Sequence, residues 1–148
     1  MARYLVVAHQ TSTSPELRRR IRQTVQIYPG SEFGVLVPAT PVRHLFGRAP
    51  GTSKGLARAR AREASVLIEE EGGILVRCEI GDSSPLAAIA TELRENPGYD
   101  NLIICTFPLG ISRWLKLDLV SKALKRFGLP VIHVVAQAPA DDAPPPGP

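Results

Sequence analysis

The stretch that decides the fold is Asn101–Val135, NLIICTFPLGISRWLKLDLVSKALKRFGLPVIHVV. Residues 102–106 are a short apolar run typical of a strand buried on both faces, 112–127 have the pattern of a helix, and 131–135 predict a second buried strand. A strand, a helix and a second strand of this kind make one βαβ unit with parallel strands. The loop at 106–113 therefore lies where α/β sheets bind ligands, at the carboxyl end of a strand and the amino end of a helix.

Working outward from this unit, the same alternation extends back to the N-terminus. Apolar runs predict three more strands, at 4–8, 32–38 and 74–80. Amphipathic helices are predicted to begin at Pro15, Ser53 and Pro85. Strands that alternate with helices in this way predict an α/β fold, a three-layer α/β/α sandwich around a five-stranded parallel sheet.

Several side chains have predicted structural roles. Ser14 offers an N-cap oxygen just before Pro15, and Gly128 is placed as the C-cap of the helix in the opening unit. Trp114 and His133 are expected in the core, His133 with a hydrogen-bond partner. These residues are therefore interpreted as parts of the scaffold.

The strand at 74–80 has a different pattern from the others. Its apolar residues alternate with Arg77 and Glu79, which is typical of a strand near the edge of a sheet. Cys78 lies in this strand and Cys105 in the strand at 102–106. Both cysteines are therefore expected to be buried and to act as small apolar residues.

Length and composition limit the classes of function. The 148 residues predict one domain over 1–137, followed by a disordered, proline-rich tail at 138–148 with almost nothing to bury. We find no signal-peptide core and no apolar run long enough to cross a bilayer, so a cytoplasmic protein is expected. The net charge is +4, but the cations are spread over the helices and only 5% of residues are aromatic. A nucleic-acid partner is therefore not favoured.

Common catalytic and cofactor motifs are incomplete. Residues 47–54 place Lys54 too late for a P-loop, and Trp114 stands where a nucleophile elbow containing Ser112 would need glycine. No GxGxxG motif follows the strand at 4–8, and the three histidines lack metal-ligand spacing. The sequence therefore assigns no catalytic residue and no metal ligand.

Polar side chains gather where the predicted strands end. They are Gln10, Thr11, Thr40, Asp82, Ser84, Thr106 and Ser112. Carboxyl ends of parallel strands share one sheet edge, so these residues predict a binding cleft, with His9 and His44 as further candidates. Gly110 and Arg113 belong to the same loop, and Arg113 adds a cation suited to phosphate or carboxylate. The alternative, that strand ends and helix caps are polar in any such sheet, stays open.

Four segments together carry a family resemblance: the run at 4–8, Gly81-Asp82 before a helix, 101–106 before a glycine-containing loop, and 129–135. With these, residues 3–136 resemble the universal stress protein family. The chain is also similar to a set of bacterial proteins with Val-Pro-Ala-Thr-Pro and Gly-x-Ser-Arg-Trp-Leu at corresponding places. The resemblance implies strand order 3-2-1-4-5, a bacterial stress-response protein, a homodimer formed through the last strand, and in one branch ATP bound between the first and fourth strands.

The chain departs from the ATP-binding pattern of that family, Gly-x2-Gly-x9-Gly-Ser/Thr. Gly110 matches the first glycine, but Arg113 occupies the second, Asp118 stands at the Gly-Ser pair, and Gln10 aligns with an acidic residue of the family. A carboxylate beside a triphosphate is repulsive. The resemblance therefore implies a divergent branch that does not bind ATP in the usual mode. A smaller anionic or nucleotide-like ligand such as AMP, or no ligand, is expected at the crevice.

Three functions stay open at this point. The first is a regulatory or ligand-sensing module. The second is a small enzyme of the nucleotide hydrolase and transferase superfamily, with Asp82, His9 or His44 as acid or base and Arg113 on an oxyanion. The third is a structural dimeric interaction protein that assembles through the strand at 131–135.

Overall fold

The computed structural model describes residues 2–39, 53–108, 114 and 118–137. Within these ranges strands and helices alternate along the chain. They are β1 (Arg3–Val7), α1 (Pro15–Ile27), β2 (Glu32–Pro38), α2 (Ser53–Glu70), β3 (Ile74–Gly81), α3 (Pro85–Glu95), β4 (Asn101–Thr106), α5 (Leu119–Phe127) and β5 (Val131–Val135). The expected proline-rich tail lies outside the described residues.

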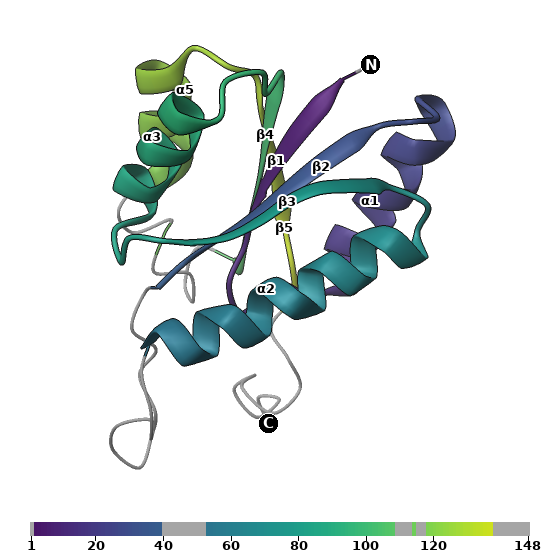
Figure 1. Ribbon diagram of the computed structural model, residues 1–148, viewed down its shortest axis with the longest axis horizontal. Coiled ribbons are helices and arrows are strands. Elements are labelled where there is room, and N and C mark those ends of the chain that lie inside the picture. The colour runs from purple at the N-terminus through teal and green to yellow at the C-terminus, as the bar shows by residue number, and fades with distance from the viewer. Residues whose placement is uncertain (1, 40–52, 109–113, 115–117, 138–148) are drawn as a thin grey trace, which may run out of the picture.

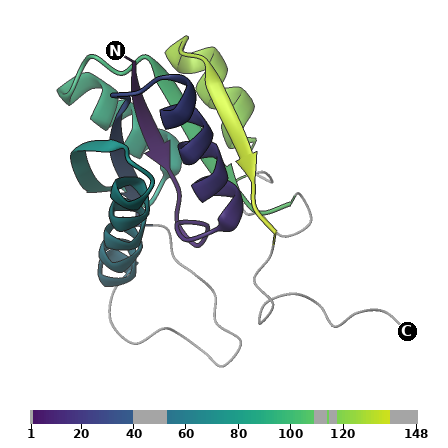
Figure 2. The same ribbon diagram turned by 90° about the vertical axis from the view of Figure 1, so that its right-hand side faces the viewer.

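The strands form one parallel sheet in the order β3-β2-β1-β4-β5. Helices α1 and α2 cover one face, and α3 and α5 cover the other (Figure 1). Figure 2 shows α1 alongside β5, which forms one edge of the sheet. The predicted three-layer α/β/α sandwich and the strand order 3-2-1-4-5 are therefore confirmed.

Two apolar cores hold the layers together. Leu17 and Ile21 of α1 are fully buried against one face, as the apolar stripe of this helix predicts. Trp114 lies in the core on the opposite face, as expected. Full burial of a leucine or isoleucine side chain contributes roughly 1.5–3 kcal/mol to the free energy of folding. Many such contributions hold the helices on each face of the sheet.

The helix ends follow their local signals. The backbone N–H of Leu17 donates to the Ser14 hydroxyl oxygen over 3.2 Å, and Pro15 occupies the first turn. At the end of α5, Gly128 has a φ of 69°, which glycine adopts without strain. Both predicted caps are confirmed.

The helix expected at 112–127 is interrupted at Asp118. This residue has a φ of 57°, in the left-handed region, and α5 begins only at Leu119. An L-residue in this conformation cannot continue a right-handed helix. The prediction of one continuous helix over this range is therefore wrong.

The edge strand β3 contains an irregularity that the sequence pattern does not reveal. Phe33 pairs with Leu75, but Gly34 pairs with Arg77, so Val76 is an extra residue in β3. Side chains alternate between the two faces of a strand, and one inserted residue reverses that alternation. The two ends of β3 therefore present opposite sets of residues to α2.

This bulge explains which apolar residues of β3 are exposed. Ile74 and Val76 are 48% and 39% exposed, whereas Ile80 packs against the core below α2. Cys105 is buried, but Cys78 is exposed beside α2. The expectation that Cys78 is buried is wrong, because an edge strand has a neighbour on one side only.

Candidate functional site

The candidate site lies where β1 and β4 end. These strands pair directly, with Val7 opposite Ile104, and the chain order of the strands reverses between them. In open α/β sheets the carboxyl ends of two such strands bound a natural crevice, because their connections leave toward opposite sides. The loop after β1 and the residues that end β4 therefore line the candidate site.

The loop after β1 is attached to β4 by side-chain contacts. Thr11 is buried, and its hydroxyl donates to the carbonyl oxygen of Cys105 over 3.1 Å. The Ser14 hydroxyl oxygen lies 3.8 Å from the sulfur of the same residue. Burial, the largest effect, raises the pKa of the Cys105 thiol. This thiol therefore stays neutral and packs in the apolar core.

Two polar side chains in the same loop are buried without partners. His9 is only 6% exposed and Ser12 is fully buried. Among the described residues, we find no hydrogen-bond partner for the two ring nitrogens of His9 or for the hydroxyl of Ser12. An unpaired buried polar group costs about 1–3 kcal/mol, so such groups in native proteins call for a specific partner, either water or ligand.

The electrostatic surroundings make His9 a neutral group. Burial, and secondarily the charge of Arg60 on α2, lowers the pKa of His9 to about 4. Arg60 donates from one terminal nitrogen to Glu63 over 3.0 Å, while its buried Nε has no partner in the described part of the chain. A neutral imidazole carries one donor and one acceptor. The loop therefore offers a donor–acceptor pair near a cation.

The structure places the predicted site residues in different surroundings. Gln10 lies exposed in the turn after β1, between buried His9 and buried Thr11. Thr106 is buried at the end of β4, and its hydroxyl lies 2.7 Å from His133 Nε2. His133 has the expected hydrogen bond, but it is exposed on the edge strand β5 and is not a core residue.

Asp82 is not brought to the same crevice. It follows the edge strand β3, which β2 separates from β1, so it lies roughly 10 Å away across two strand spacings. Its carboxylate accepts from the backbone N–H of Ser84 over 2.8 Å and so closes the turn before α3. An acid–base pair of Asp82 with His9 has no support in this geometry. The other predicted residues lie outside the described ranges: Thr40, His44, Gly110, Ser112 and Arg113.

From the sequence, His9 is only a further candidate for the binding cleft, and Ser12 and Arg60 are not indicated. The signal for Ser12 is its position in the loop that follows a buried strand. Arg60 is one of several arginines on α2, and only the packing of α2 against the sheet shows which one lies near β1. In the described part of the chain, no three His, Cys, Asp or Glu residues form a metal-binding group, and no helix is long and apolar enough to cross a membrane.

The architecture defines a class, the three-layer α/β proteins with a parallel sheet of order 3-2-1-4-5, in which the chain order reverses between β1 and β4. No protein-family profile matches the sequence. No curated protein matches it either. Solved structures do match, and three of them are universal stress proteins.

The first is a universal stress protein in complex with cAMP, with a TM-score of 0.59 and 16% identity over 90% of this chain and 96% of that one. The second, from Archaeoglobus fulgidus, has a TM-score of 0.62 and 16% identity over 90% and 93%. The third, from Arabidopsis thaliana with AMP bound, has a TM-score of 0.57 and 15% identity over 98% and 97%. The chain has the universal stress protein fold, and at this level of identity the likeness concerns the fold alone.

Proposed function

We propose that this protein is a ligand-binding module that holds a small adenine nucleotide, such as AMP, at the ends of β1 and β4. The observation that carries the proposal is His9, which is 6% exposed with both ring nitrogens unpartnered among the described residues. Such a side chain is costly unless something pairs with it. A bound ligand supplies that partner at the place where this class of sheet binds ligands.

The chemistry of the loop favours a nucleotide. Neutral His9 offers one donor and one acceptor, and adenine presents an acceptor next to an amino donor. The cation of Arg60 lies close enough to influence His9 and attracts a phosphate. Two proteins of the same fold carry cAMP or AMP, which makes this ligand class a reasonable choice.

We propose a monophosphate in preference to a triphosphate. Asp118, at the start of α5, is exposed, and its side chain makes no capping hydrogen bond to this helix. Its carboxylate would repel the additional charges of ATP if the phosphates extended toward α5. The role that follows is regulation by ligand occupancy rather than hydrolysis.

Isothermal titration of the pure protein with AMP, cAMP and ATP tests this proposal. AMP should bind, and His9→Leu should weaken it about tenfold or more, a loss of about 1.4 kcal/mol. Gln26→Leu removes an exposed polar side chain in the last turn of α1, away from the ends of β1 and β4, and is the control, which should bind as the parent does. Circular dichroism shows whether each variant is folded.

Three results would overturn the proposal or part of it. No binding of AMP or cAMP up to about 1 mM would overturn it, since that limit is weaker than any useful regulatory affinity. Equal losses in His9→Leu and the Gln26→Leu control would remove His9 from the site. Tighter binding of ATP than of AMP would contradict the preference for a monophosphate.

We further propose that the protein is a cytoplasmic, bacterial homodimer whose single domain spans 1–137, with a part in the stress response. Support for the dimer comes from β5, an edge strand whose Val135 is 46% exposed, with exposed Leu124 on α5. An apolar edge strand is prone to pair with another chain. Light scattering should show a dimer that Val135→Lys converts to a monomer. A monomeric parent protein would end this part of the proposal.

A further inference from the structure

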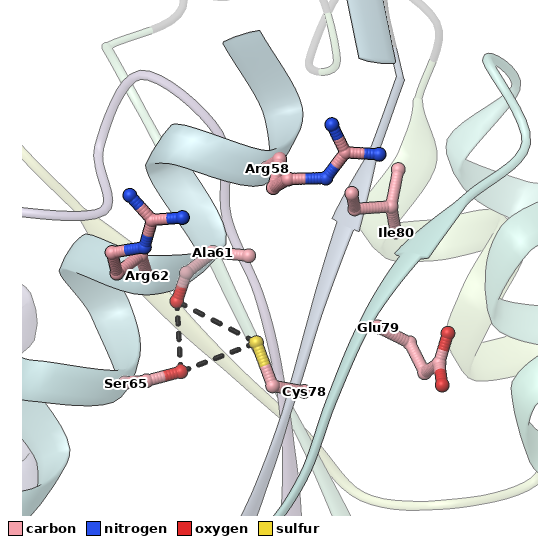
Figure 3. Close-up of a pocket in the computed structure, with 7 residues that line it drawn as sticks. All are labelled: Arg58, Ala61, Arg62, Ser65, Cys78, Glu79 and Ile80. Carbon is pink, nitrogen blue, oxygen red and sulfur yellow. Dashed lines mark hydrogen bonds between the residues drawn. The ribbon is translucent and has the colours of Figure 1, made fainter. Parts of the chain in front are cut away.

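A cavity lies between α2 and the edge strand β3, away from the ends of β1 and β4. Its volume is about 390 Å³, which is within the range of small-molecule sites. Arg58, Ala61, Arg62 and Ser65 line it from α2, and Cys78, Glu79 and Ile80 line it from β3 (Figure 3). We propose that this cavity is a binding site for a small organic phosphate.

The helix side of the cavity follows from spacing on α2. Arg58, Ala61, Arg62 and Ser65 recur at intervals of three and four residues, so they share one face of the helix. Arg60 lies two residues from both arginines and therefore on a different face, near His9. The cavity is thus separate from the β1 and β4 crevice, and this inference does not rest on the function proposed above.

The strand side of the cavity depends on the bulge in β3. The extra residue Val76 shifts the pairing so that Cys78 is opposite Val35. This register turns Cys78 and Ile80 toward α2, while Arg77 points to the other face and contacts Glu92 on α3. Without the bulge, Arg77 would face α2 in place of these two residues.

The polar groups at the floor of the cavity already contact one another. The Ser65 hydroxyl lies 2.8 Å from the carbonyl oxygen of Ala61 and 3.2 Å from the Cys78 sulfur (Figure 3). A hydroxyl has one proton, which the shorter contact to the Ala61 carbonyl takes, and the Cys78 thiol donates to the same carbonyl oxygen over 3.7 Å. The floor therefore presents sulfur and methyl groups, which suit the carbon skeleton of a ligand rather than its charge.

The α2 side of the cavity rim carries two arginines. Arg58 and Arg62 are exposed and have no ion pair with any described residue, and they repel each other across one helical turn. Glu79 also lines the cavity, but its carboxylate is paired with Arg77 at 3.0 Å. A phosphate between the two guanidinium groups would receive paired N–H donors from each and remove the repulsion.

The rate at which the Cys78 thiol is labelled can show whether a ligand occupies this cavity. It is exposed, whereas Cys105 is buried, so a neutral disulfide reagent such as 4,4′-dithiodipyridine labels Cys78 first. The experiment measures this labelling rate in the full chain with and without phenyl phosphate or inorganic phosphate, at constant ionic strength. The variants are Arg58→Gln/Arg62→Gln and, as a matched control, Arg19→Gln/Arg20→Gln, which removes two exposed arginines from α1.

Phenyl phosphate at a few times its dissociation constant should slow labelling about fivefold in the parent and in the α1 control. The Arg58→Gln/Arg62→Gln variant should lose this protection, and each rate is compared within one variant because arginine charge also affects thiol reactivity. Inorganic phosphate should protect less, since it lacks the apolar part. Absence of protection at about 10 mM phenyl phosphate, or equal protection in both double variants, would overturn the proposal.

Discussion

The Thr11 hydroxyl donates to the carbonyl oxygen of Cys105 over 3.1 Å, and this bond joins the loop after β1 to the end of β4. The two residues are 94 positions apart in the sequence. The same loop carries buried His9, so this bond helps to hold the unpartnered imidazole in place. The scaffold of the proposed site therefore depends on a contact between distant parts of the chain.

Thr11→Val tests this connection. The variant keeps the shape of the side chain but removes the donor, so the free energy of unfolding should fall by about 1 kcal/mol. AMP affinity should fall as well, because the loop loses its attachment to β4. Urea unfolding and titration measure the two effects.

Thr13→Val is the control for that experiment, because Thr13 lies exposed in the same loop. It should change stability by less than about 0.5 kcal/mol. Equal losses in the two variants would show that the hydroxyl bond to Cys105 contributes nothing.

His9 should make the protein less stable as the pH falls. The pKa of His9 is about 4 in the folded protein, against an ordinary value of 6.5. Between these values the unfolded chain binds a proton that the folded chain does not, so stability is full above pH 6.5 and declines as the pH falls toward 4. From pH 6.5 to 5 the decline should amount to roughly 1.5 kcal/mol.

His9→Gln should abolish that part of the decline, as measured by urea unfolding at pH 7, 6 and 5. The carboxyl of Glu71 does not interfere, because hydrogen bonds from Arg22 and Arg18 lower its pKa to about 2. Its contribution is lost only below the ordinary carboxylate range, under about pH 4.5. An unchanged pH dependence in His9→Gln would show that the buried imidazole does not resist protonation.

Glu92 is the central acceptor of a network on the α3 side of the sheet. It is 5% exposed and accepts from Arg77 Nε over 2.8 Å and from the Tyr99 hydroxyl over 3.0 Å. Glu92→Ala leaves both donors without this partner and should cost about 3 kcal/mol in urea unfolding. Glu79→Ala breaks only the half-exposed pair with Arg77 and should cost less than about 1 kcal/mol. Similar costs for the two variants would contradict the central role of Glu92.

Gly34 makes room for Tyr99. A Cβ at Gly34 would collide with the hydroxyl and ring of Tyr99, so Gly34→Ala should destabilise the protein by about 2 kcal/mol or more. Tyr99→Ala opens space at this position, so the double variant should lose less than the sum of the single losses, by about 1 kcal/mol. Additive losses in this cycle, measured by thermal or urea unfolding, would show that the collision is relieved in another way.

Local sequence patterns predicted most of the secondary structure. The stripe of Leu17 and Ile21 and the cap oxygen of Ser14 each depend on neighbours within a few positions, and the structure agrees with each. Asp118 is the exception, because its left-handed backbone interrupts a stretch whose composition favours helix. Aspartate is one of the few residues besides glycine that adopt a positive φ, but a single aspartate does not show that the helix is interrupted there.

The sequence by itself determined the α/β class and the parallel sheet, because buried strand runs and amphipathic helices are encoded by periodicity over a few residues. Tertiary structure decided which polar groups lack partners and which arginines share a cavity. The bulge at Val76 arises from pairing with β2, and the burial of His9 and its nearness to Arg60 arise from packing of α2. Such features depend on contacts between segments far apart in the chain, which local periodicity does not record.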